Sequence, residues 1–273
     1  GFPTTKEEWK QAVAQEEPAI AFVGDSFTEG YYLPYEFTFP YLLGQKLGQQ
    51  VINLGVSGYA PDQYLLTARQ HLKQYHVSTI IVMFFPYNDV SDVFKDTYQG
   101  YAKPIFGDHL EAPMNVPLPK LKGRPHNETW FQWIVHSSAI YSALRPIVRK
   151  YFAFTDPTSN APILYGKEQM KKALTLIKQI QVEFPEKHFM VYYIPMSKEI
   201  LNQTVKDNVR TFQAICTELK MPCFSMERIL KEYANPEACY LSKDGHFSKQ
   251  GARAVANHLY AILSKGYLGL DGL

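Results

Sequence analysis

The heptapeptide GDSFTEG at residues 24–30 is the stretch on which the interpretation of this sequence depends. It follows a short apolar run at residues 19–23 and precedes a segment with helical character. A serine in a glycine-flanked turn between a buried strand and a helix is where an α/β protein can expose a nucleophile. Ser26 is therefore the candidate nucleophile. The competing interpretation is that Ser26 only caps a helix.

Outward from this turn, short apolar runs alternate with amphipathic segments. The runs predict strands over residues 19–24, 50–54, 79–85, 188–194 and 222–226. Helices are predicted over residues 4–17, 36–48, 167–184, 198–220 and 226–233, from Pro61 to Tyr75, and from Ser248 onward. Such alternation predicts an α/β fold, in which a parallel sheet is covered by helices on both faces.

The alternation is interrupted between about residue 90 and residue 165. Five prolines between residues 104 and 125 preclude long regular elements there, and Trp130 to Lys150 can form a helix that is kinked at Pro146. Insertions of this length commonly form lids, binding walls or partner surfaces. We expect residues 1–273 to form a single domain that carries this insertion after its third strand.

Composition limits the partners of the protein. The chain has 28 Lys and Arg against 26 Asp and Glu, and no basic block, which argues against a nucleic-acid partner. No apolar run approaches the roughly 20 residues of a transmembrane helix. The sequence begins with Gly1 rather than methionine, so a signal or anchor could have been removed. A secreted, periplasmic or membrane-anchored protein is favoured over a cytoplasmic one, although the sequence does not fix the compartment.

The cysteines and histidines show no metal-binding pattern. The three cysteines (Cys216, Cys223 and Cys239) are odd in number and contain no Cys-x-x-Cys pair, so buried free thiols are the favoured interpretation, with a Cys216–Cys223 bridge as the alternative. The eight histidines lack the spacing of metal ligands. We expect no metal and no organic cofactor.

Three candidate groups follow predicted strand ends. A serine hydroxyl needs a general base and donors that stabilise the oxyanion formed when it attacks a carbonyl. Ser26, Gly58 and Asn88 each follow a strand, and the carboxyl ends of parallel strands meet at one edge of a sheet. The backbone N–H groups of Ser26 and Gly58 and the side-chain amide of Asn88 are therefore the predicted oxyanion donors.

The predicted base lies in the segment KDGHFS at residues 243–248, before the last helix. His246 can take the proton of Ser26, and Asp244 can orient the His246 ring. Ser57 is a rival nucleophile in the turn at residues 55–58. The Gly-x-Ser-x-Gly elbow would need glycine at position 59, where Tyr59 stands, so Ser57 is disfavoured.

These segments resemble the blocks of the SGNH (GDSL-type) hydrolase superfamily, in the same order. Residues 24–26 match its nucleophile block, 53–58 its glycine block, 88–89 its asparagine block, and Asp244 with His246 its last block. The resemblance implies a three-layer flavodoxin-like sandwich that catalyses ester hydrolysis or acyl transfer without metal or organic cofactor.

Two positions depart from the pattern of the superfamily. Pro86 stands where the superfamily usually has glycine, and Lys243 stands where it usually has the aspartate. Asp244 is two residues before His246, a spacing that some relatives that acetylate polysaccharides also use. A Ser–His dyad oriented by a backbone carbonyl is the alternative to the triad.

Residues near the nucleophile leave two interpretations open. The aromatic residues after the turn either pack against the insertion or form a wall of the substrate pocket; they are Tyr31, Tyr32, Tyr35, Phe37 and Phe39. Asp25 and Asp89 are expected to fix their local turns by hydrogen bonds.

The sequence as a whole predicts a serine esterase that acts on a small-molecule, glycan or lipid ester. The alternative is an O-acyltransferase, which transfers an acyl or acetyl group to a cell-surface glycan or lipid by using a sugar hydroxyl in place of water. A catalytically silent binding module on the same fold is the third hypothesis.

Overall fold

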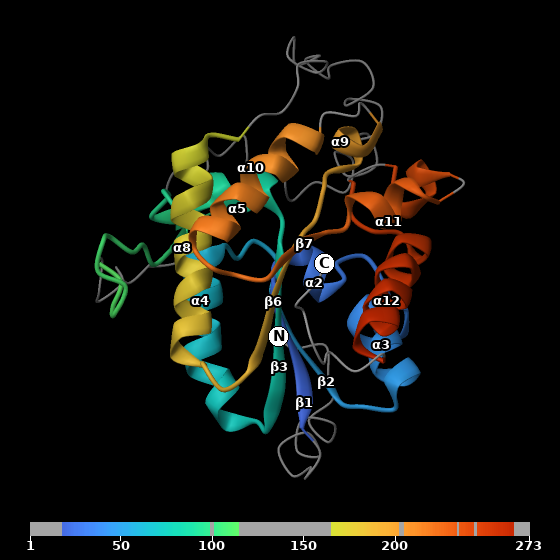
Figure 1. Ribbon diagram of the computed structural model, residues 1–273, viewed down its shortest axis with the longest axis horizontal. Coiled ribbons are helices and arrows are strands. Elements are labelled where there is room, and N and C mark those ends of the chain that lie inside the picture. The colour runs from blue at the N-terminus through green and yellow to red at the C-terminus, as the bar shows by residue number, and fades with distance from the viewer. Residues whose placement is uncertain are drawn as a thin grey trace, which may run out of the picture.

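A five-stranded parallel sheet lies at the centre of the protein (Figure 1). The computed structural model describes residues 18–98, 101–114, 165–201, 205–233, 235–242 and 245–264. The strand order is β2-β1-β3-β6-β7, which is the order of the flavodoxin-like sandwich that the family resemblance implied. The strands are β1 (Ala19–Gly24), β2 (Val51–Gly55), β3 (Val77–Phe84), β6 (His188–Tyr193) and β7 (Cys223–Ser225).

Long helices cover both faces of the sheet and complete the predicted three layers (Figure 1). One face carries α4 (Pro61–His71), α8 (Lys167–Glu183) and α10 (Val205–Glu218), and the other carries α3 (Phe39–Leu47) and α12 (Lys249–Leu263). Successive residues of β3 alternate between the two cores, because side chains of a strand point to opposite faces: Ile80 packs into one core and Ile81 into the other.

Short helices begin close behind the carboxyl ends of four strands. They are α2 (Ser26–Glu29) after β1, α5 (Pro86–Asp92) after β3, α9 (Ser197–Leu201) after β6, and α11 (Glu227–Lys231) after β7. Single 3₁₀ turns are η1 (Tyr35–Phe37), η2 (Leu72–Gln74) and η3 (Pro236–Cys239). The chain runs outward from β1 to β2 and then crosses back to β3, so the carboxyl ends of β1 and β3 flank the switch point where ligands bind in such sheets.

Local signals set the helix ends as predicted. Gly48 has a φ of 63° and closes α3 in the left-handed conformation that glycine adopts readily. Pro61 is the first residue of α4, where the missing N–H of proline has no cost. The Ser248 hydroxyl accepts hydrogen bonds from the backbone N–H groups of Gln250 and Gly251 and so caps α12.

The single helix predicted over residues 198–220 is wrong, because the structure has the two helices α9 and α10 there. Glu199 of α9 turns inward, where its carboxylate accepts hydrogen bonds from Tyr193, Asn208 and the backbone N–H of Met196. A buried carboxylate needs such donors. They fix the start of α9 as a separate short helix beside the end of β6.

The first part of the insertion is fastened to the helical layer that contains α4 and α8. It begins with the hairpin β4 (Thr97–Tyr98) and β5 (Tyr101–Ala102). Lys103 then forms a buried ion pair with Asp62 of α4, and Arg69 of α4 bonds both the Leu110 carbonyl and Glu183 of α8. The helix predicted over residues 130–150 lies outside the described residues, as does the one predicted over residues 4–17.

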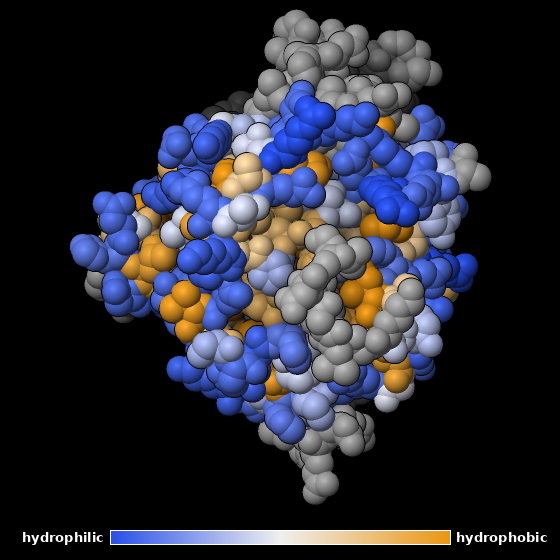
Figure 2. All heavy atoms as spheres, viewed as in Figure 1, coloured by the Kyte–Doolittle hydropathy of each residue, from blue (hydrophilic) through white to orange (hydrophobic). Residues whose placement is uncertain are grey.

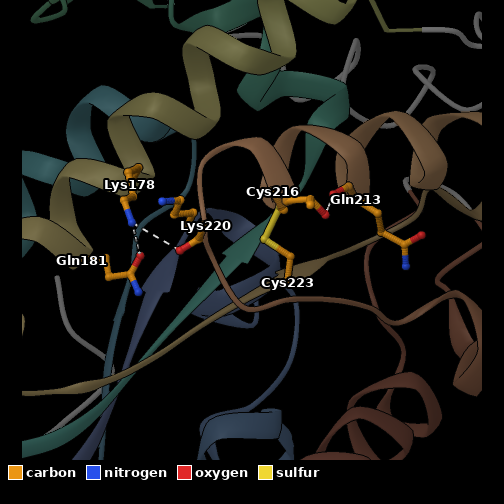
Figure 3. Close-up of a disulfide and its surroundings, with 7 residues drawn as sticks. Lys178, Gln181, Gln213, Cys216, Lys220 and Cys223 are labelled. Atoms are coloured by element: carbon orange, nitrogen blue, oxygen red, sulfur yellow. Dashed lines mark hydrogen bonds between the residues drawn. A yellow bond between two sulfur atoms is a disulfide. The ribbon is translucent and has the colours of Figure 1, made fainter. Parts of the chain in front are cut away.

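The free-thiol interpretation of the cysteines is wrong for two of them. Cys216 of α10 and Cys223 of β7 form a disulfide (Figure 3), whereas Cys239 is a buried free thiol. The Cα atoms of the pair lie 6.1 Å apart, because the chain reverses direction between the end of α10 and the edge strand β7. Lys178 of α8 donates to the Lys220 carbonyl in the same reversal (Figure 3).

The surface seen in Figure 2 is largely hydrophilic, with apolar side chains in separate patches. None of the helices in the described ranges is long and apolar enough to cross a membrane. Nor does any group of three or more His, Cys, Asp or Glu residues in these ranges have the arrangement of a metal site.

Candidate active site

Ser26 is the first residue of α2, directly beyond the carboxyl end of β1. The Asp25 carboxylate accepts a hydrogen bond from the Phe27 N–H and caps the turn, as expected from the sequence. Gly24 is required, because a Cβ atom there would lie 2.0 Å from the Thr28 hydroxyl oxygen. The turn therefore holds Ser26 between a buried strand and a short helix, in the place where the sequence predicted it.

His246 lies against Ser26 although 220 residues separate them in sequence. Its Nε2 is 2.7 Å from the Ser26 Oγ, which is hydrogen-bonding distance. The His246 ring also stacks on Phe27, with 4.9 Å between ring centroids. A serine and a histidine in this contact can transfer a proton between them.

The loop before α12 sets the position of His246. The loop reverses through Gly245, whose φ of 82° suits glycine, and the Leu241 N–H donates to the His246 carbonyl. Phe247 then pairs with Tyr240 in an isolated bridge. Asp244, the predicted partner of the His246 ring, lies outside the described residues, so its role stays a prediction.

The other two predicted oxyanion donors lie at the same edge of the sheet. Asn88 is on α5, and its side-chain nitrogen donates to Asp25 at 3.2 Å, which ties α5 to the nucleophile turn. An amide nitrogen carries two hydrogens, so Asn88 keeps one for a second acceptor. Gly58 follows β2 with a φ of 77°, and the Tyr98 ring of the β4–β5 hairpin lies so close that a Cβ atom at position 58 would be 2.4 Å from it.

Ser57, the rival nucleophile, is engaged elsewhere. Its hydroxyl donates to the Glu29 carboxylate at 2.5 Å, and its backbone N–H donates to the same oxygen at 2.7 Å. A serine that donates to a carboxylate in this way is held as a structural group. This contact favours Ser26 over Ser57 as the nucleophile, because the Ser26 hydroxyl contacts His246.

Two buried carboxylates belong to the nucleophile turn and to the neighbouring helix α5. Asp25 and Asp89 are both fully buried. Burial raises the pKa of Asp25 from 3.8 to about 7, because the charged form loses its hydration, while the hydrogen bonds from Phe27 and Asn88 act in the opposite direction. Burial also raises the pKa of Asp89 well above its usual range, and the Asp25 charge adds to this. As expected, Asp89 fixes its local turn, because it accepts hydrogen bonds from the Phe85 N–H and the Tyr64 hydroxyl.

The raised pKa of Asp25 predicts a stability that falls as pH rises. Between its unfolded pKa of 3.8 and its folded pKa of about 7, the folded chain keeps a proton that the unfolded chain releases. The free energy of unfolding should therefore decrease across this window, by up to about 4 kcal/mol from this group. Urea unfolding between about pH 4 and about pH 8 measures the slope.

Asp25→Asn should flatten this slope, because asparagine does not titrate. Asp89 acts in the same direction, so part of the slope should persist in the variant. An unfolding free energy whose pH dependence is the same in Asp25→Asn and in the wild type would contradict the assignment to Asp25.

A pocket of about 590 Å³ opens beside the Ser26–His246 pair. It lies between the start of α5, the start of α9 and the loop that carries His246, and apolar side chains form much of its wall. Its lining residues are Ser26, Phe27, Phe85, Tyr87, Asn88, Met196, Ser197, Lys198, Glu237, Tyr240, Leu241, Ser242, Gly245 and His246. A pocket of this volume can hold a small organic ligand.

The aromatic residues after the nucleophile turn divide between the two interpretations. Phe39 is buried in the core, where its ring packs edge-on against Phe22. Tyr31 and Tyr32 are 44% and 64% exposed, and their ring centroids lie 5.7 and 5.9 Å from that of His246. These two tyrosines therefore flank the candidate site and do not belong to the core.

Sequence reasoning missed Glu29 and Tyr98. Glu29 stands in the GDSFTEG stretch, but its contact with Ser57 joins two segments that are far apart in sequence. Tyr98 stands in the insertion, and no sequence pattern connects it to Gly58. Of the two, only Glu29 had a signal: its position one helical turn after Ser26 places it near the same edge of the sheet.

Comparisons with known proteins agree with the fold and identify a family. The profile of the GDSL-like lipase/acylhydrolase family matches residues 22–254. No curated protein matches the chain. A G-D-S-L family protein from Desulfitobacterium hafniense DCB-2 has a similar fold, with 13% sequence identity and a TM-score of 0.53 over 90% of this chain and 100% of that one. A lipase/acylhydrolase from Enterococcus faecalis is similar too, with 11% identity and a TM-score of 0.52 over 94% of this chain and 100% of that one. The psychrotrophic esterase EstA from Pseudoalteromonas sp. also has a similar fold, with 13% identity and a TM-score of 0.50 over 93% of this chain and 100% of that one. At these identities the structural likeness shows the fold alone.

Proposed function

Because this chain belongs to the GDSL-like lipase/acylhydrolase family, we propose that it is a serine esterase with Ser26 as nucleophile and His246 as general base. The observation that carries the proposal is the 2.7 Å contact between the Ser26 Oγ and the His246 Nε2. We also propose that residues 1–273 form one domain, since the family profile extends over residues 22–254.

In the proposed reaction, the Ser26 oxygen attacks the ester carbonyl while His246 takes the serine proton. The carbonyl oxygen becomes an oxyanion, which the N–H groups of Ser26 and Gly58 and the Asn88 amide stabilise. The intermediate then collapses to an acyl-enzyme, and His246 gives the proton to the leaving alcohol. A water activated by His246 hydrolyses the acyl-enzyme and restores Ser26. Asp244 is proposed to orient the His246 ring, with a dyad oriented by a backbone carbonyl as the alternative.

An ester series tests this function. We expect the wild type to hydrolyse short p-nitrophenyl esters and to be labelled by a fluorophosphonate on the peptide that contains Ser26. Ser26→Ala should take up no label. Labelling of Ser57 or of another serine, or turnover at the wild-type rate in Ser26→Ala, would contradict the proposal. No turnover of any ester together with no labelling of the wild type would instead support the silent binding module.

Transfer to a sugar or lipid hydroxyl is the second candidate, and two observations favour it. The pocket beside Ser26 leaves room for an acceptor, and the exposed Tyr31 and Tyr32 lie beside His246, where an attacking hydroxyl would approach. Aromatic faces offer an apolar surface with a polar edge, which suits the faces of sugar rings. Candidate glycans added to the acyl-enzyme separate the two reactions: acylated glycan indicates transfer, and free acid alone indicates hydrolysis.

The disulfide bears on the compartment in which the protein works. Bonds such as Cys216–Cys223 form and persist where the surroundings are oxidising. We therefore propose that the protein works outside the cytoplasm, as a secreted, periplasmic or membrane-anchored enzyme.

A further inference from the structure

Glu29 joins the nucleophile helix to the glycine turn. It is the last residue of α2, three residues after Ser26, and one of its carboxylate oxygens accepts both the backbone N–H and the hydroxyl of Ser57. Hydrogen bonds to a charged acceptor are stronger than those between neutral groups. The two contacts therefore hold Ser57 against the end of α2.

The turn that follows Val56 sets the direction of the Gly58 N–H. The Tyr59 N–H donates to the Val56 carbonyl at 3.1 Å, which makes residues 56–59 a β-turn with Ser57 and Gly58 at its centre. Gly58 has a positive φ of 77° and Ser57 does not, which is the pattern of a type II turn. Type I and type II turns differ in the orientation of the central peptide, which here joins Ser57 to Gly58. Rotating this peptide would therefore reverse the direction in which the Gly58 N–H points.

The backbone at Glu29 is held in place, as well as its carboxylate. The Asn53 side chain at the end of β2 donates to the Thr28 carbonyl at 2.8 Å and accepts from the Gly55 N–H. A Cβ atom at position 55 would lie 2.4 Å from the Glu29 nitrogen, so α2 packs directly on the backbone of β2. Glu29 is thus a short, rigid connection between Ser26 and the turn that carries Gly58.

We propose that Glu29 is a positioning residue for this reaction: its carboxylate holds Ser57 so that the Gly58 N–H faces the oxyanion formed on the acyl carbonyl. The proposal rests on the esterase chemistry above, since the direction of that N–H matters only if an oxyanion forms beside Ser26. Glu29 itself touches neither the Ser26 hydroxyl nor the His246 ring in any contact of the described residues.

Glu29→Ala is expected to lower kcat about 10- to 100-fold, because loss of a whole oxyanion donor costs about 10²- to 10³-fold and a misdirected one costs part of this. KM should change by less than about threefold, since the oxyanion exists only after attack. Fluorophosphonate labelling of Ser26 should slow by a factor similar to that in kcat, because phosphonylation builds charge on the same oxygen. Glu29→Gln, whose amide oxygen still accepts, should recover most of the activity.

Two further variants separate positioning from a general loss of structure. Glu227→Ala removes a partly exposed glutamate on α11 whose carboxylate bonds Lys231, and it should leave kcat unchanged. Ser57→Ala removes one of the two hydrogen bonds and should lower kcat by a smaller factor than Glu29→Ala. If Glu29→Ala does not fold, Ser57→Ala and Glu29→Gln still test the proposal.

Two outcomes would overturn the role of Glu29 and leave the esterase assignment intact. One is wild-type kcat in Glu29→Ala or Ser57→Ala while Ser26 is still labelled. The other is a raised KM at unchanged kcat, which would make Glu29 a substrate-binding residue. Activity at the wild-type level in Ser26→Ala would instead reject the esterase assignment itself.

Discussion

His246→Ala is expected to lower kcat/KM for short esters by about 10⁴- to 10⁶-fold, and the double variant with Ser26→Ala should be no less active than either single one. The reason is that a nucleophile and its base act as a unit: once either is missing, the other contributes nothing to the reaction. The 2.7 Å contact between the two side chains is the structural basis for this expectation.

The measurement is a set of kcat/KM values for wild type, both single variants and the double variant on one short ester. His76→Gln is the matched control, since His76 is exposed and directly precedes β3 at the opposite end of the sheet from Ser26. Its kcat/KM should equal that of the wild type. A double variant that loses the product of the two single effects would show that the residues act independently.

The sequence predicted those features that depend on neighbouring residues. The Ser26 turn, the start of α4 at Pro61 and the cap of α12 at Ser248 are each set by side chains within a few residues. The parallel sheet followed from alternation along the chain. Because the carboxyl ends of parallel strands meet at one edge, the sequence also placed Ser26 and Asn88 together before any contact was known.

Features that join distant segments could not be predicted. The Glu29–Ser57 contact depends on how α2 packs on β2, and the Tyr98–Gly58 contact depends on where the hairpin folds back. Each of these requires knowledge of which turns face one another, and a local pattern does not contain it.

Lys103 makes the clearest contact between distant segments, because lysine is almost never buried without a partner. It is 1% exposed and forms an ion pair with Asp62, which is fully buried near the start of α4. Its ammonium group also donates to the Asp92 carbonyl at 3.0 Å. Lys103 therefore fastens the segment after the β4–β5 hairpin to both α4 and α5.

Lys103→Met is expected to lower the free energy of unfolding by about 3–5 kcal/mol, because it leaves the Asp62 carboxylate buried without its cation. Burial raises the pKa of Asp62 even in the presence of Lys103, whose charge and hydrogen bond act in the opposite direction. Removing the cation should raise that pKa further. Protonation then relieves part of the penalty, so the loss of stability should be smaller at about pH 5 than at about pH 8. Urea unfolding at the two pH values measures both effects.

The double variant Lys103→Met/Asp62→Leu distinguishes an isolated charge from a simple loss of packing. Removing both members of a buried pair is often nearly neutral, because neither charge then has to be buried. We therefore expect the double variant to recover most of the stability that Lys103→Met loses, and to lose the pH dependence of that effect. A double variant as unstable as the single one would mean that the contact of Lys103 with Asp92 stabilises the hairpin more than its charge pair with Asp62 does.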